Sequence, residues 1–244
     1  MAGGKKGTLN MSEYKTIGIL GGMGPMATYD LGIKIVDNTK ADKDQEHVPV
    51  IADCNTRIAD RTAAILKGGD DPRPEMIKSA KRLEAAGADF IIMPCNTAHY
   101  FYDDVCGAVS IPVLHMPRET AARLKERGIK KAAVLATDGT CQSGIYEKAL
   151  EGEGIEAVYP SEEMQKVVMC LIYDYVKAGN MDFSALDING VVDDVKSKGA
   201  EIMILGCTEL PIALDVIGET ALPTIDPTAE LARAAVKAAG APLK

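Results

Sequence analysis

Two stretches of this chain are near copies of each other. GADFIIMPCNTA occupies residues 87–98 and GAEIMILGCTEL occupies residues 199–210, and in both a short apolar run ends close to a cysteine. Cys95 and Cys207 stand at matching places in the two copies, 112 positions apart. A repeat at about half the chain length predicts two related halves, each of which presents one cysteine at the end of the same strand.

Predicted strands and helices alternate along the chain. Six apolar runs rich in Ile and Val have the length and the turn-like flanks of buried parallel strands. They are KTIGIL, VPVIAD, DFIIMP, KAAVLAT, IEAVY and EIMILG, at residues 15–20, 48–53, 89–94, 131–137, 155–159 and 201–206. Apolar residues recur at helical spacing between them, as in residues 164–175. Strands that alternate with helices predict an α/β fold with parallel sheets.

The repeat also predicts the division of the chain into domains. A length of 244 residues suits one large domain or two small ones, and we expect two pseudo-symmetric, three-layer α/β domains with the active site in the cleft between them. Residues 14–113 with 225–244 would form the first domain, and 114–224 the second. The crossing falls at SIPVLHMP, residues 110–117, because its two prolines discourage regular structure. Residues 1–13 are small, polar and rich in Gly, and we expect them to be disordered.

Composition excludes several classes of function. The net charge of −8 argues against binding to nucleic acid or to an anionic membrane, since both require a basic surface. No apolar run is long enough to span a bilayer, and the N-terminus lacks the apolar segment of a signal peptide. Six cysteines without a C-x-x-C pair indicate a reduced, cytoplasmic compartment. Cys95 and His99 have a spacing that could begin a zinc site, but no further ligands complete it, so we expect no metal.

Each repeated cysteine stands where a thiol is chemically useful. Cys95 and Cys207 follow strands and precede predicted helix starts near Thr97 and Thr208. A helix N-terminus stabilises a thiolate, so such a site can lower the pKa of a cysteine toward neutrality. Two thiols on opposite sides of a ligand can remove a proton from one face of a carbon and return one to the other, which inverts the carbon without a cofactor. We interpret the remaining cysteines as small core residues: Cys54, Cys106, Cys141 and Cys170.

Other functions remain open at this point. GMGPMA, residues 22–27, fits the dinucleotide-binding pattern G-x-G-x-x-A after a strand and suggests an NAD-dependent oxidoreductase. Asp53, the acidic residue that ends the next strand, lies rather far along the chain for that role, and the paired cysteines stay unexplained. A decarboxylase or a cis–trans isomerase would need only one thiol. A non-catalytic amino-acid-binding protein would need carboxylate ligands but no thiols.

Four ordered motifs resemble a known family. They are GGMGPMAT, DRTAAIL, PCNTAHYFYD and GCTEL, at residues 21–28, 60–66, 94–103 and 206–210. Together they resemble the aspartate/glutamate racemase family, from about Thr16 to the C-terminus. Glu209 favours the aspartate racemase branch, because the related glutamate racemases typically have His at that place. The resemblance implies a homodimeric, two-cysteine racemase that needs no cofactor and interconverts L- and D-aspartate by proton transfer at the α-carbon.

The resemblance and the local pattern predict substrate contacts. Asp60 can cap a helix and place Arg61 in its first turn, where the helix dipole disfavours a cation. A local reason for that arginine is therefore expected, and the resemblance implies that it binds the side-chain carboxylate, with Lys177 as a second substrate ligand. The other predicted substrate contacts are Met23, Gly24, Asn96, Thr97, Thr137, Thr140 and Thr208. Glu209 and His99 are predicted to tune the thiols.

One departure from the family pattern leaves the substrate open. The family usually has prolines in the segment before the arginine, and this chain has Thr56 and Ala59 there, with an additional Arg57. A looser loop with a second cation leaves glutamate, or a broader set of amino acids, as alternatives to aspartate.

Overall fold

Two parallel β-sheets organise the chain in the computed structural model, which describes residues 14–244. The first has the order β2-β1-β3, from β1 (Ile17–Gly21), β2 (Val50–Cys54) and β3 (Phe90–Ile92). The second has the order β5-β4-β6-β7, from β4 (Lys131–Ala136), β5 (Glu156–Val158), β6 (Ile202–Gly206) and β7 (Thr224–Ile225). The prediction of an α/β fold with parallel sheets is confirmed. The disorder expected for residues 1–13 concerns a segment outside the described residues.

Helices connect the strands in both halves. In the first half these are α1 (Pro25–Asn38), the 3₁₀ turn η1 (Asp44–Glu46), α2 (Arg61–Leu66), α3 (Arg73–Ala85), the 3₁₀ turn η2 (Thr97–Phe101) and α4 (Tyr102–Cys106). They continue with α5 (Met116–Glu126), α6 (Asp138–Gln142), α7 (Ile145–Glu151), α8 (Glu162–Cys170), the π-helical η3 (Leu171–Val176), α9 (Ile188–Ser197), α10 (Glu209–Ile217) and α11 (Pro227–Ala238).

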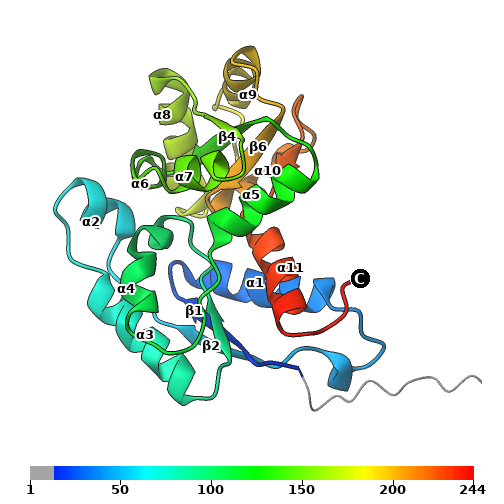
Figure 1. Ribbon diagram of the computed structural model, residues 1–244. Helices are drawn as coiled ribbons and strands as arrows, with labels where there is room; N and C mark the ends of the chain where they lie inside the picture. Colours follow the sequence, from blue (N-terminus) through cyan, green and yellow to red (C-terminus); the bar gives the residue numbers. More distant parts are fainter. Residues whose placement is uncertain (1–13) are drawn as a thin grey trace, which may run out of the picture.

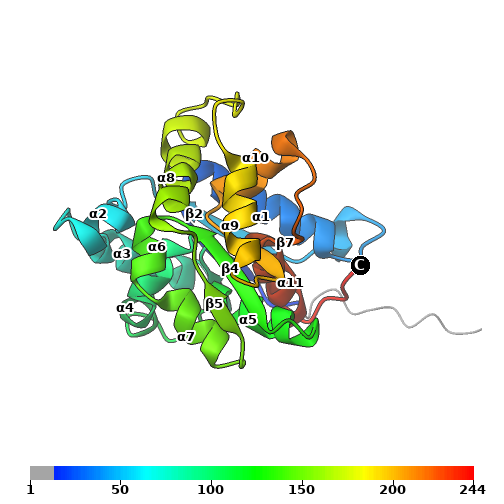
Figure 2. The ribbon, with the colours of Figure 1, turned by 90° about the horizontal axis from the view of Figure 1, so that it is seen from above.

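The strands β1, β4 and β6 are buried almost entirely, which explains why they are apolar along most of their length, whereas the edge strand β2 is partly exposed. In β4, Leu135 packs with α8 and α9, whereas the adjacent Val134 packs with α5 and α7. Figure 2 shows these two pairs of helices on opposite sides of β4. In β1, Ile19 packs with α1 and α11, and Leu20 packs with α3 and α4 on the other face. Both halves therefore have three layers, as predicted.

The repeated sequence builds the same helix-to-strand junction twice. Gly87 and Gly199 follow α3 and α9 with φ of +94° and +86°, a conformation that favours glycine. Two residues later, Asp89 accepts a hydrogen bond from the Thr16 backbone N–H at 2.6 Å. Glu201 accepts one in the same way from the Lys131 backbone N–H at 2.9 Å. In both copies, the glycine and the acidic residue before the strand therefore help to fix how β3 and β6 pair with the central strands.

The C-terminal helix returns to the first half of the chain. Leu231 and Val236 of α11 pack in one core with Ile17 of β1 and Leu31 of α1, and Figure 1 shows α11 beside α1, below the second sheet. The strand before it, β7, pairs with β6 of the second sheet. The predicted division into 14–113 with 225–244 and 114–224 stays a prediction. What the core contacts show is that α11 packs with α1 and β1.

Candidate active site

A small pocket lies where strands of both sheets end. Its walls come from the segments that follow β1, β2, β3, β4 and β6, together with the end of η3. The cavity measures about 20 Å³, which is room for about one water molecule. The carboxyl ends of parallel strands are the usual place for ligands in α/β folds. Here two such edges, one from each half of the chain, enclose a single pocket.

Most of the predicted site residues line this pocket. Both Cys95 and Cys207 do, and both are buried. The other predicted residues in its walls are Met23, Arg61, Asn96, Thr97, Thr137, Lys177, Thr208 and Glu209. Four lining residues were not predicted as site residues: Asp60, Thr62, Tyr173 and Gly206. Asp60 is recognisable in the sequence only as a helix cap. Thr62 and Tyr173 leave no signal there, because their approach to the pocket depends on how the two halves pack.

Three predicted residues lie outside the pocket walls. Gly24 is the N-cap of α1, and its carbonyl accepts a hydrogen bond from the Thr28 hydroxyl at 3.2 Å. Thr140 is buried behind the wall, with its hydroxyl 2.8 Å from that of Thr97. His99 is the third.

His99 holds the backbone of the Cys95 loop. Its Nδ1 lies 2.9 Å from the Cys95 carbonyl oxygen, and its Nε2 accepts a hydrogen bond from the Met116 backbone N–H at 3.1 Å. Nδ1 therefore carries the proton. Complete burial, helped by the neighbouring His115, lowers the pKa of His99 to about 3, so the ring is neutral. His99 thus links this loop to α5, and the tuning of the thiol by His99 stays a prediction.

Arg61 is the first residue of α2, as predicted, and Asp60 caps the helix by accepting from the Ala63 N–H at 2.7 Å. Its Nη1 donates to the carbonyl of Ala59 at 3.0 Å and its Nη2 to that of Met23 at 3.2 Å. Nε is buried and has no partner among residues 14–244. Backbone carbonyls thus fix the guanidinium in the pocket wall and leave part of its donor set available to a ligand.

The guanidinium also lies beside Cys95. Burial is the largest influence on the pKa of Arg61 and lowers it, but the nearby Cys95 and Asp60 side chains outweigh burial, and the pKa is raised. A cation next to a sulfur atom favours the ionised form of the thiol.

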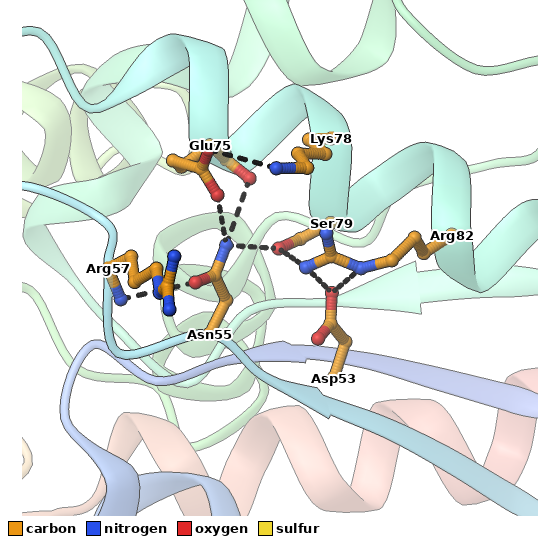
Figure 3. Close-up of polar contacts among 7 residues, drawn as sticks. All are labelled: Asp53, Asn55, Arg57, Glu75, Lys78, Ser79 and Arg82. Carbon is orange, nitrogen blue, oxygen red and sulfur yellow. Dashed lines mark hydrogen bonds and ion pairs between the residues drawn. The ribbon is translucent and has the colours of Figure 1, made fainter.

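The loop that carries Arg61 is anchored by a polar network beside the first sheet (Figure 3). The Asn55 amide donates to Glu75 Oε2 at 2.9 Å and to the Ser79 hydroxyl at 3.1 Å, both on α3. Its carbonyl oxygen accepts from the Arg57 backbone N–H at 3.1 Å. The loop is therefore tied to α3. Arg57, the additional cation of this chain, has an exposed side chain and does not line the pocket.

Across the pocket, Cys207 faces a carboxylate. Its thiol donates to Glu209 Oε2 at 2.9 Å, and the Thr208 hydroxyl donates to the same oxygen at 3.1 Å. The other carboxylate oxygen pairs with Lys177 Nζ at 2.5 Å. Burial works most strongly to raise the pKa of Glu209, but Lys177 and these hydrogen bonds hold it below its ordinary value. Glu209 is therefore an anion that links the thiol to the lysine.

This carboxylate overturns one expectation for Cys207. The pKa of the thiol is raised well above its ordinary value, mainly by burial and further by the charge of Glu209. Lys177 and the Glu209 backbone N–H act in the opposite direction, as expected at the start of α10, but they are outweighed. The pKa of Cys207 is thus raised, whereas its position before a helix predicts a lowered pKa.

A cluster of hydroxyl groups joins the two halves at the floor of the pocket. Thr97, from the first half, lies 3.2 Å from Thr137, from the second, measured between their Oγ1 atoms. Thr62 donates to Thr137 at 3.4 Å, and the Tyr173 hydroxyl donates to Thr62 at 3.5 Å. The hydroxyls of Thr97 and Thr137 are therefore engaged with each other when the pocket is closed.

Comparison with known proteins identifies this arrangement. Residues 20–235 match the Asp/Glu/Hydantoin racemase family, which is most of the chain. The broad specificity amino-acid racemase RacX of Bacillus subtilis (strain 168) is 34% identical over 226 residues, which covers 90% of this chain and 96% of that protein. The chain belongs to the Asp/Glu/Hydantoin racemase family. It is thus a racemase, an enzyme of the isomerase class, and the NAD-dependent oxidoreductase and the non-catalytic binding protein are set aside.

Solved structures of racemases share the fold. The aspartate racemase of Picrophilus torridus is 34% identical, with a TM-score of 0.82 over 94% of this chain and 96% of that one. A glutamate racemase from Francisella tularensis subsp. tularensis SCHU S4, in complex with D-glutamate, is 21% identical, with a TM-score of 0.62 over 93% of this chain and 81% of that one. At that identity the second comparison concerns the fold alone.

Within residues 14–244, no helix of this racemase combines the length and the apolar character that a membrane crossing requires. In the same part of the chain, no three His, Cys, Asp or Glu side chains are grouped so as to hold a metal ion. All six cysteines are free thiols.

Proposed function

We propose that this racemase interconverts L- and D-aspartate, without a cofactor, through Cys95 and Cys207. The observation that carries the proposal is that both cysteines, from matching strand ends of the two halves, line one pocket with two cationic side chains. A substrate between the halves would meet one thiol on each face of its α-carbon. Carboxylates would be held by Arg61 and Lys177, one from each half.

We propose that Cys207 carries its proton in the resting enzyme, because burial and the charge of Glu209 raise the pKa of its thiol. Cys95, which lies beside the Arg61 guanidinium, would act as the base. Cys95 would remove the α-proton, the electron pair of the broken C–H bond would delocalise into the α-carboxylate, and Cys207 would deliver its proton to the opposite face. One C–H bond breaks and one forms. The enzyme is left with a Cys95 thiol and a Cys207 thiolate, which is the state required for the reverse reaction.

Substrate entry requires movement. A cavity of about 20 Å³ is far too small for an amino acid, and Lys177 and Glu209, which both line it, are paired with each other. We propose that the halves open around the crossing at residues 110–115, and that a substrate carboxylate then shares or replaces Glu209 at Lys177. Closure re-forms the contact between Thr97 and Thr137.

A broader substrate range is the second candidate, and one observation favours it. The positive charge of Lys177 is already balanced by Glu209, so a neutral side chain would leave no unpaired cation in the pocket. The similarity to a broad specificity amino-acid racemase supports the same candidate. Glutamate belongs to this range, because members of the family act on it by their names.

One experiment tests the reaction and its substrate together. L- and D-aspartate are incubated with the enzyme in D2O without pyridoxal phosphate, and circular dichroism and α-deuterium are followed. Decay of the dichroism with deuterium at the α-carbon is expected from either enantiomer. Absence of both would refute aspartate racemisation. Parallel runs with glutamate, asparagine and serine separate an aspartate-specific enzyme from a broad one.

We also propose that the enzyme is a homodimer of a reduced, cytoplasmic compartment. Four apolar side chains on one face of α1 are exposed, namely Met26 at 71%, Tyr29 at 60%, Ile33 at 61% and Val36 at 48%. Their spacing forms a stripe along the helix, and such stripes commonly mark protein contacts. Light scattering should give twice the chain mass for the wild type and the chain mass for Ile33→Glu. A monomeric wild type would overturn the dimer.

A further inference from the structure

Tyr146 touches both cysteine loops. It belongs to α7, in the second half, and its side chain is completely buried. Its hydroxyl donates to Asn96 Oδ1 at 2.5 Å, next to Cys95. On the other side, its ring lies near Gly206, the residue before Cys207: a Cβ added at Gly206 would meet the ring at 3.5 Å, an ordinary contact distance. One side chain therefore stands between the two segments that carry the proposed bases.

The amide of Asn96 has one end engaged and one end free. Oδ1 accepts from Tyr146, whereas Nδ2 is buried and has no partner among residues 14–244. Asn96 is only 3% exposed and lines the pocket. Buried donors are almost always paired in native proteins, and a buried donor in a pocket wall is paired once a ligand supplies an acceptor. The carboxylate of an amino acid is such an acceptor.

We propose that Tyr146 is a positioning residue, which aims the Asn96 amide so that Nδ2 donates to a carboxylate oxygen of the substrate. The hydroxyl binds the carbonyl oxygen of the amide. It thereby prevents a flip of the amide that would point this oxygen at the carboxylate and repel it. Because the two residues belong to different halves, the donor is oriented only when the halves are closed. This inference rests on the proposed amino-acid substrate.

Tyr146→Phe tests the role, since it removes the hydroxyl and keeps the ring against Gly206. We expect KM to rise about tenfold, because a carboxylate donor is no longer oriented, with a smaller change in kcat. Tyr159→Phe is the matched control: the Tyr159 hydroxyl is buried without a partner within residues 14–244, so its removal should leave KM and kcat unchanged. A purely structural role would lower the melting temperature and the active fraction of Tyr146→Phe without raising KM.

A second variant separates orientation from folding. Asn96→Asp keeps an oxygen for the Tyr146 hydroxyl and replaces Nδ2 by an oxygen, so it should fold as the wild type does and lose substrate binding. If Tyr146 acts through Asn96, adding Tyr146→Phe to Asn96→Ala should cause less than about twofold further loss. Two outcomes would overturn the inference. One is a double variant whose loss equals the product of the two single losses, and the other is an Asn96→Asp enzyme that keeps the KM of the wild type.

The same measurements distinguish this inference from the proposed function. A wild type that racemises amino acids while Tyr146→Phe has an unchanged KM refutes the positioning role alone. A wild type that is inert toward every amino acid refutes the proposed function and this inference with it.

Discussion

The Cys95 loop and the Cys207 loop share a backbone and differ in charge. Asp89 and Glu201 clamp the two junctions in the same way, so each cysteine leaves its strand at the same place. Beyond that point the surroundings diverge, with a guanidinium beside Cys95 and a carboxylate beside Cys207. The repeat thus supplies two thiols in different electrostatic surroundings. A reaction that removes one proton and delivers another requires two groups that differ in protonation at its start.

The two loops also differ in how they are tied to the rest of the protein. His99 binds the Cys95 carbonyl and the start of α5 through its two ring nitrogens. The matching place after Cys207 is Pro211, which has no polar side chain to do so. The second loop is stabilised instead by Glu209, whose carboxylate reaches Lys177 on another element. The first loop is thus anchored by the neutral ring of His99. The second is anchored by the ion pair of Glu209 with Lys177, whose partners a charged substrate can change.

Removal of either thiol should have the largest effect on activity, because it leaves only one of the two compared loops with a proton-transfer group. Cys95→Ala and Cys207→Ala should each lower kcat for racemisation by about 10⁴-fold or more, because each removes one of two proton-transfer groups. Polarimetry or circular dichroism from both enantiomers measures the loss. Cys106→Ala, a thiol outside the pocket, is the control and should keep full activity. Full racemisation by either single variant would rule out the two-thiol mechanism.

The cation of the first loop should have the next largest effect. Arg61→Ala removes a guanidinium that lies beside Cys95 and lines the pocket, so kcat/KM should fall roughly 10²- to 10³-fold. Arg57→Ala removes an arginine four positions earlier whose side chain is exposed, and its kcat/KM should change little. Equal losses of kcat/KM in the two variants would show that the effect comes from the loss of a positive charge and not from the position of Arg61.

The anion of the second loop controls the proton on Cys207. Glu209→Gln removes a negative charge that raises the pKa of this thiol, so the pKa falls and Cys207 ionises at lower pH. The alkaline limb of kcat/KM should move to lower pH, with about a tenfold loss at its former optimum. Thiolate absorbance of Cys207 in a Cys95→Ala background measures the shift directly, and Glu163→Gln, at an exposed residue of α8, is the control. An alkaline limb that stays in place would contradict the assignment.

The ring that anchors the first loop should affect stability and its pH dependence more than catalysis. The pKa of His99 falls from 6.5 to about 3 in the folded enzyme, so the folded state binds its proton less readily than the unfolded chain. Its contribution is complete above pH 6.5 and is lost as the pH falls toward about 3, by roughly 5 kcal/mol in total.

Urea unfolding at several pH values between these limits tests the sign. The free energy of unfolding of the wild type should fall more steeply with acidification than that of His99→Gln, whereas His47→Gln should follow the wild type. Parallel curves for the wild type and His99→Gln would show that His99 is not the titrating group.

Much of the site could be predicted because it lies at the ends of strands. A cysteine that follows an apolar strand in an α/β fold is placed at the ligand edge of its sheet by topology alone, and the pocket contains both Cys95 and Cys207. The helix cap at Asp60 likewise predicts the start of α2 and the place of Arg61. Such local rules depend on neighbouring residues only, so they can be read from the chain.

Residues that meet across the halves could not be predicted in this way. Tyr173 and Lys177 follow a helical stripe, but η3 is π-helical there, with the Lys177 N–H bonded to the Ile172 carbonyl five residues earlier. This changes which side chains face the pocket. Tyr146 of α7 meets Asn96, 50 residues earlier in the chain, only in the folded protein. No spacing in the sequence encodes such contacts.

The sequence by itself determined the α/β fold, the pairing of the halves and the presence of two equivalent thiols, because strand patterns, caps and repeats are local. Only the tertiary structure decided that the thiols are unequal. The protonation of a buried sulfur depends on burial and on charges within a few ångströms, and the partners of Cys207 are Glu209, two residues away, and Lys177, from a distant element. The position before a helix predicts a lowered pKa for both thiols, whereas burial and the charge of Glu209 raise the pKa of Cys207.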